Sequence, residues 1–187
     1  GTVYFGSDSK VYALDGSNGA LVWEHDLVTS TVASSPSVAS NGTVYIGTGG
    51  SIVSLNGATG AKNWDYAITG SAISCPAIGS DGTVFGASAT NGDIFAIDGT
   101  TGAEKWLLNF GNRVTSSPAV SANGTVYIGS LDGHLYALDT AIGEMRWRLY
   151  VVDPLNPDSG VDGSPAIGSD GTIYFSIGNE NKVFALR

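Results

Sequence analysis

Apolar and polar residues follow one another along this chain in short runs, and no run keeps the spacing of an amphipathic helix. Residues 43–46 and 125–128 are rich in β-branched and aromatic side chains, which suit a pleated, half-buried surface. Such runs are bounded by Gly, Asn, Asp or Ser, a composition typical of strands joined by tight turns. The pattern therefore predicts an all-β protein.

The runs repeat with a period near forty residues, and several phrases recur in the same register. A Gly-Thr-Val-Tyr phrase opens each repeat, an Ala-Leu-Asp phrase follows, and a glycine stands four residues before a tryptophan. The tryptophans are Trp23, Trp64, Trp106 and Trp147. A Ser-Pro or Cys-Pro phrase then precedes the next repeat.

Within one repeat the pattern predicts four antiparallel strands, for example at residues 36–39, 43–47, 51–55 and 61–65. Asn41-Gly42 links the first two of these, and Asn-Gly supplies the positive φ that tight hairpins need. Four short strands every forty residues predict a β-propeller blade. A helical solenoid lacks support because no helical period is present, and a β-sandwich does not repeat its sequence in this way.

Counting strands gives a single propeller domain or propeller fragment over residues 1–187, with about 4.5 blades. We assign a partial blade to residues 1–29, whole blades to 30–70, 71–112 and 113–153, and a partial blade to 154–187. The two partial blades do not complement each other, because both contain the second and third strands. We therefore expect an arc of a larger ring, with a five-bladed ring or two arcs in a homo-oligomer as the alternatives.

The phrase Ala-Leu-Asp-x-x-x-Gly-x-x-x-Trp, at residues 13–23 and 137–147, resembles the tryptophan-docking repeat of pyrroloquinoline-quinone-type (PQQ-like) β-propellers. The stretch 116–130 is similar to the same repeat, and the resemblance covers the whole chain. It implies that the four tryptophans close the outer strands and pack between neighbouring blades, as structural residues. Quinone-using members of this family carry an adjacent cysteine pair, a calcium ion and an aspartate base.

The resemblance does not extend to that cofactor, because Cys75 is the only cysteine. Cys75 takes the place of the serine before the proline in other repeats, so we interpret it as a small side chain near the centre of the ring. We therefore expect no cofactor, no metal, no catalytic residues and no enzymatic activity.

The charge composition limits the classes of partner that the chain is expected to bind. The net charge is −9 and only eight residues are basic, so the chain lacks the clustered Lys and Arg that nucleic acids and anionic membranes attract. We expect no nucleic acid and no membrane insertion, and the low charge content suits a secreted or periplasmic domain.

Other polar residues have competing interpretations. Asp15, Asp98 and Asp139 recur at one register, which favours turn capping over catalysis. Asp8, Asp93, Asp132 and Asn179 lie in or near loops without the alternating acidic pattern of a calcium loop. His25 and His134 belong to non-adjacent blades. Asn41 and Asn123 match the N-glycosylation pattern, but the turns already explain them.

The segment 148–163 lengthens one repeat on the face with variable loops, where binding usually occurs. Its candidate partner-binding residues are Tyr150, Asp153, Pro154, Asn156 and Asp158.

We predict a non-catalytic PQQ-like propeller that serves outside the cytoplasm as a binding or scaffold module for protein or carbohydrate. One alternative is a fragment of a quinoprotein dehydrogenase whose active site lies outside these residues. Another is a scaffold resembling the propeller lipoprotein of outer-membrane protein assembly.

Overall fold

The computed structural model describes residues 1–28, 30–71, 74–151, 160–178 and 182–187, and over these residues the secondary structure consists of strands and turns. None of these residues forms a helix long and apolar enough to cross a membrane. The strands are β1 (Thr2–Ser7), β2 (Lys10–Asp15), β3 (Leu21–Asp26), β4 (Ser37–Val38), β5 (Thr43–Gly47), β6 (Ser51–Asn56), β7 (Lys62–Ala67), β8 (Ala77–Ile78), β9 (Thr83–Ala87), β10 (Asp93–Asp98), β11 (Glu104–Asn109), β12 (Ala119–Val120), β13 (Thr125–Gly129), β14 (His134–Asp139), β15 (Met145–Tyr150), β16 (Ala166–Ile167), β17 (Ile173–Ile177) and β18 (Lys182–Leu186).

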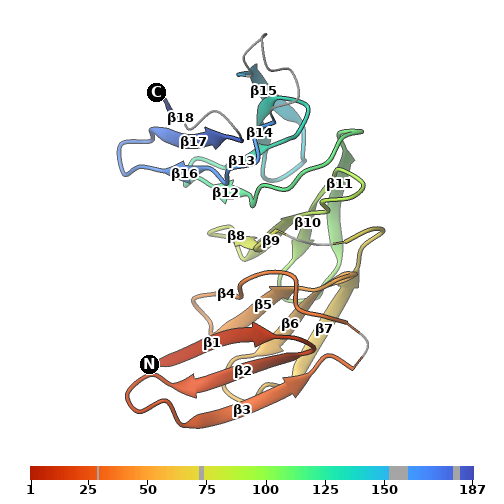
Figure 1. The fold of residues 1–187 in the computed structure, drawn as a ribbon, viewed down its shortest axis with the longest axis vertical. Coiled ribbons are helices and arrows are strands. Elements are labelled where there is room, and N and C mark those ends of the chain that lie inside the picture. The colour runs from red at the N-terminus through yellow and green to blue at the C-terminus, as the bar shows by residue number, and fades with distance from the viewer. Residues whose placement is uncertain (29, 72–73, 152–159, 179–181) are drawn as a thin grey trace.

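These strands form five antiparallel sheets whose spatial order follows the sequence. Blade 1 holds β1–β3, blade 2 holds β4–β7, blade 3 holds β8–β11, blade 4 holds β12–β15 and blade 5 holds β16–β18. Figure 1 shows the blades following one another along an open arc, with blades 1 and 5 at its two ends. The expected all-β propeller architecture is confirmed.

The first strand of each complete blade is shorter than the sequence pattern predicts. In blade 3 it pairs through two residues only, Ala77 with Phe85 and Ile78 with Val84. Pro76 has no N–H to donate before the pair, and a tight turn follows, in which the Gly82 N–H donates to the Gly79 carbonyl at 3.0 Å. The innermost strand is therefore limited to two residues, where four were predicted.

The last two strands of blades 1 to 4 pair with a shift in register, at Ala13/Leu14, Ser54/Leu55, Ala96/Ile97 and Ala137/Leu138. In blade 3, Trp106 pairs with Ala96 but Glu104 pairs with the adjacent Ile97. Because neighbouring residues of a strand point to opposite faces, the bulge turns the tryptophan toward the next blade and the residue two positions earlier toward the previous one.

The hydrophobic core is divided into four layers, one between each pair of neighbouring blades. The layer between blades 3 and 4, for example, contains Phe85 and Ile94 from one blade and Ile128 and Leu138 from the other, all fully buried. Each sheet is therefore apolar on both faces, and stability depends on contacts between blades.

Candidate functional site

The tryptophans form the most regular polar contacts between blades. The Nε1–H of Trp23 donates to the Gly57 carbonyl at 2.8 Å, and Trp64 donates to the Gly99 carbonyl at 3.0 Å. Trp106 donates to Thr140 in the same way, at 3.0 Å. In each case the acceptor follows the Ala-Leu-Asp phrase, or its variant, of the next blade. The tryptophan therefore joins its own outer strand to the following blade, in the position that the family resemblance implied.

A glycine of the next blade lies directly against each docked ring. A Cβ added at Gly60 would stand 2.8 Å from Cδ2 of Trp23, and one at Gly143 would stand 2.8 Å from Cδ2 of Trp106. Both glycines also have positive φ, +72° and +75°. Sequence reasoning assigned these glycines to the turn alone, so their contact with the preceding blade's tryptophan was missed.

The four tryptophans differ in exposure, although they occupy equivalent positions. Trp23 and Trp106 are buried at 8% exposure, whereas Trp64 and Trp147 are half-buried. The repeat predicts that all four are buried at equivalent positions, so the half-buried state of Trp64 and Trp147 corrects that expectation.

The recurring aspartates cap the turns that precede the docking glycines. The Asp98 carboxylate accepts the N–H groups of Thr100 and Thr101 at 2.9 and 2.8 Å. Hydrogen bonds from Thr101 and Thr100 hold the pKa of Asp98 below its ordinary value. Asp15 and Asp139 cap the corresponding turns. These carboxylates are engaged by the backbone, which agrees with the capping interpretation.

The other candidate residues do not assemble into a joint centre. Asp132 accepts a hydrogen bond from the Tyr136 hydroxyl at 2.5 Å and one from the main-chain N–H of His134 at 3.0 Å. Asp93 accepts one from the side-chain amide of Asn109 at 2.5 Å. His25 lies in blade 1 and His134 in blade 4. Asn179 lies outside the described residues. Over the described part of the chain, no group of three or more His, Cys, Asp or Glu residues could hold a metal ion.

Cys75 interrupts a line of hydrogen bonds along the inner edge of the arc. The Cys75 N–H donates to Oγ of Ser117 at 2.9 Å, and the Ser117 N–H donates to Oγ of Ser164 at the same distance. One blade earlier, the register places the Cys75 thiol opposite Ser35, where a serine hydroxyl accepts in the other steps. Because a thiol is a weak acceptor, we expect this link to be weaker than the other two.

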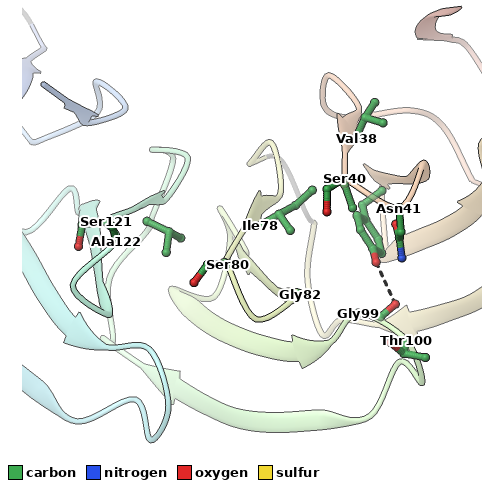
Figure 2. Close-up of a pocket in the computed structure, with 14 residues that line it drawn as sticks. Val38, Ser40, Asn41, Ile78, Ser80, Gly82, Gly99, Thr100, Ser121 and Ala122 are labelled. Atoms are coloured by element: carbon green, nitrogen blue, oxygen red, sulfur yellow. Dashed lines mark hydrogen bonds between the residues drawn. The ribbon is translucent and has the colours of Figure 1, made fainter. Parts of the chain in front are cut away.

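A cavity of about 520 Å³ lies where the inner turns of blades 2, 3 and 4 meet. Figure 2 shows Val38, Ile78 and Ser80 around this space, and the dashed line marks the hydrogen bond from the Tyr45 hydroxyl to the Gly99 carbonyl, 2.9 Å long. None of its lining residues is charged. The cavity therefore offers hydroxyl, amide and aliphatic contacts, but no charged side chain.

A second groove, of about 340 Å³, lies between the outer strands of blades 3 and 4. Its lining includes Leu108, Phe110, Tyr136, Met145 and Arg148. The Phe110 and Tyr136 rings stack there with centroids 3.9 Å apart.

Among the proposed partner-binding residues, Tyr150 ends β15 with 52% of its surface exposed and packs edge-on against His134 at 5.1 Å. Asp153, Pro154, Asn156 and Asp158 lie outside the described residues.

A family model described as "Outer membrane protein assembly factor BamB" matches residues 1–74 and residues 70–187, so the two matches cover the whole chain. The chain belongs to this family. Membership confirms the resemblance to PQQ-like repeats that the tryptophan phrases suggested. No curated protein gives a match.

Several solved structures share the fold of this chain over nearly its whole length. The crystal structure of BamB from Moraxella catarrhalis is 24% identical, with a TM-score of 0.80, and the alignment covers 98% of this chain and 53% of that one. The quinohemoprotein alcohol dehydrogenase from Comamonas testosteroni is 18% identical, with a TM-score of 0.80 and coverage of 100% and 40%. A europium-containing methanol dehydrogenase is 16% identical, with a TM-score of 0.82 and coverage of 99% and 47%. The chain thus spans about half the length, or less, of these propeller structures.

Proposed function

We propose that this chain belongs to a non-catalytic, extracytoplasmic propeller that binds protein partners as a scaffold. The observation that carries the proposal is the match of a BamB family model to the whole chain. BamB is, by that description, an assembly factor for outer membrane proteins, and a factor of this kind works by contact with other proteins. The resemblance to outer-membrane assembly scaffolds thus becomes the leading version of the binding hypothesis.

The use of polar side chains in the described blades supports a binding role over a catalytic one. The recurring aspartates cap turns, and the cavity at the inner turns of blades 2, 3 and 4 has an uncharged lining. General acid–base catalysis requires a titratable group within reach of the substrate. The titratable group in the lining of that cavity is the Tyr45 hydroxyl, which donates to the Gly99 carbonyl and whose pKa is raised by burial, so it is poorly suited to exchange protons at neutral pH.

Site-directed photo-crosslinking tests the protein-binding role. Benzoylphenylalanine is placed at Ser40, Ala122, Met145 or Val183 in the full-length gene product, expressed in its own host. We expect a discrete, light-dependent protein adduct from at least one of these exposed positions. Failure of all four positions, together with retention of the protein on a glycan array, would instead favour the carbohydrate-binding version.

A fragment of a quinoprotein dehydrogenase is the second candidate, because two of the structural matches above are dehydrogenases with TM-scores of 0.80 and 0.82. The test adds pyrroloquinoline quinone and calcium to the full-length gene product, since the active site of this candidate would lie outside residues 1–187, and measures dye-linked alcohol oxidation. We expect no turnover above a heat-inactivated control. Turnover well above that control would overturn the non-catalytic proposal.

A further inference from the structure

The outer groove between blades 3 and 4 differs from the equivalent places in the other junctions. At the junction of blades 2 and 3, the Tyr66 hydroxyl donates to Glu104 at 2.5 Å and the Tyr66 ring packs on Phe95 at 5.5 Å. The positions of Tyr66 and Glu104 correspond to Leu108 and Met145 at the junction of blades 3 and 4. Two apolar side chains thus replace a pair that bridges its junction, and a space of about 340 Å³ remains between the blades.

The junction of blades 1 and 2 provides a second comparison. It also contains a cavity, of about 300 Å³, whose wall combines aliphatic side chains with charged or titratable ones and has no Phe, Tyr or Trp. The aliphatic residues are Leu27, Val28 and Val53, and the charged or titratable ones are His25, Asp26, Lys62 and Asp65. Water solvates such charged walls well, so displacing it brings little gain. Among these three junctions, the one between blades 3 and 4 alone combines an open groove with an aliphatic and aromatic wall. Burial of that wall would be favourable.

The residues of this groove are those that protein interfaces favour. Phe110 and Tyr136 form a stacked pair, and Met145 is 52% exposed beside them. Aromatic residues, methionine and arginine are enriched where partners meet, because they bury large areas with few rotatable bonds or with adaptable shapes. A hydrogen bond from Tyr136 to Asp132 holds the floor of the groove in place.

Two side chains of opposite charge, Arg148 and Glu144, line the groove at different points along the chain. Arg148 pairs with Tyr136 across β14 and β15, and its guanidinium lies close enough to the phenol to affect its pKa. Glu144, which stands just before β15 and four residues before Arg148, also lines the groove. A carboxylate of a bound segment is therefore attracted toward Arg148 and repelled at Glu144, and this repulsion fixes the orientation.

We propose that this groove docks a short segment of a protein partner in which an apolar side chain stands next to a carboxylate. The apolar side chain lies between Leu108 and Met145 above the stacked rings, and the carboxylate faces Arg148. The proposal rests on the protein-binding function proposed above and gives that function a location and a partner chemistry.

The single methionine of the chain makes a direct test possible. Labelling the methionine methyl group with ¹³C places one NMR reporter in the groove, because Met145 is the only methionine. The probe is 3-phenylpropionate, which combines an aromatic ring with a carboxylate, and the control is 3-phenyl-1-propanol. We expect the acid to shift the Met145 signal in a saturable way, with an affinity at least about tenfold higher than that of the alcohol, or about 1.4 kcal/mol.

Two variants separate the groove from general surface effects. Arg148→Gln should abolish the preference for the acid, whereas Lys62→Gln, which removes a cation from blade 2, should preserve it. A preference that survives Arg148→Gln, equal responses to acid and alcohol, or no response to either would overturn the proposal.

Crosslinking in the host distinguishes failure of the groove from failure of the function. Adducts from benzoylphenylalanine at Met145 that Arg148→Gln reduces at least fivefold support the groove. Adducts that form only at Ser40, Ala122 or Val183 overturn the groove and leave the protein-binding function in place. Absence of adducts at every position counts against both.

Discussion

The junction between blades 2 and 3 and the junction between blades 3 and 4 are alike near the docked tryptophan and different at the outer rim. In both, a tryptophan donates to a main-chain carbonyl of the next blade at 3.0 Å and lies against a glycine with positive φ. The outer rim of a junction is formed by the residue two positions after one tryptophan and the residue two positions before the next. There, the junction of blades 2 and 3 is bridged by Tyr66 and Glu104, and the junction of blades 3 and 4 remains open. The repeat thus fixes how blades join, while positions two residues before and after each tryptophan are free to acquire a function.

Removing a docked ring is the strongest way to break this similarity. Trp106→Ala should lower the free energy of unfolding by about 3–5 kcal/mol, because a large aromatic side chain leaves a cavity in a packed layer. Trp64→Ala should lie at or below the lower end of that range, since Trp64 is half-buried. Denaturant unfolding measures both. Met145→Ala changes an exposed side chain and is the control, which should unfold at the midpoint of the parent. If Trp106→Ala also unfolds at that midpoint, the docking role is wrong.

Substituting the docking glycines tests the contact from the other side. Gly143→Ala should destabilise the chain by about 1–3 kcal/mol more than Gly82→Ala, because its new Cβ overpacks against Trp106. Gly82 has a similar φ, +82°, but nothing lies within 4 Å of an added Cβ, so it reports the backbone cost alone. Thermal unfolding of the two variants gives the difference. Equal losses would mean that the ring does not need the glycine.

Exchanging the rims should convert one junction into the other. Tyr66→Phe removes the bond to Glu104 and should cost about 0.5–1.5 kcal/mol. The double substitution Leu108→Tyr and Met145→Glu should close the groove between blades 3 and 4 and abolish probe binding there.

Burial, followed by the hydrogen bond to Glu104, raises the pKa of Tyr66. Ultraviolet titration of Tyr66→Phe should therefore lose one late-ionising tyrosine. If Tyr66→Phe shows as many late-ionising tyrosines as the parent, the hydrogen-bonded bridge from Tyr66 to Glu104 is contradicted.

Lowering the pH should reduce the stability of the chain by a smaller amount, and through blade 3 more than through blade 4. Hydrogen bonds from Thr83, together with Lys105, lower the pKa of Asp81 to about 2. A carboxyl whose pKa is lower in the folded state stabilises fully above its unfolded pKa of about 4, and this contribution is lost as the pH falls toward 2. Because Asp81 is largely exposed, the effect should be below about 1 kcal/mol.

The corresponding residue of blade 4 is Asn123, which does not titrate. Asp81→Asn should therefore flatten the decline in stability between pH 4 and pH 2, and Asn123→Asp should steepen it. Chemical denaturation at several pH values measures both slopes. Identical slopes in the parent and Asp81→Asn would show that this turn contributes nothing to acid sensitivity.

Features governed by local chemistry could be predicted from the sequence. Tight turns require residues that accept positive φ, so Gly42 and Gly82 located the hairpins, and β-branched runs located strands such as β5. The aspartate caps were predictable for the same reason, since a carboxylate reaches N–H groups two or three residues along the chain.

Features that depend on the meeting of two blades were not predictable. The bulge before each tryptophan, the contact of Gly143 with Trp106 and the bridge from Tyr66 to Glu104 join residues that are distant in sequence or need the strand register. The groove between blades 3 and 4 could have been suspected only by aligning Leu108 and Met145 with their polar counterparts. The proposed partner loop was chosen for its length and not for its chemistry, and of its five candidate residues the structure describes only Tyr150.

Docking through main-chain atoms makes neighbouring blades interchangeable. The acceptors are carbonyl groups of Gly57, Gly99 and Thr140, so the joint requires no particular side chain at the acceptor. A gene duplication that inserts or deletes one forty-residue unit therefore creates a new neighbour pair whose joint is already compatible. Propellers of this type can change in blade number without redesigning an interface, while each copy evolves its own rim.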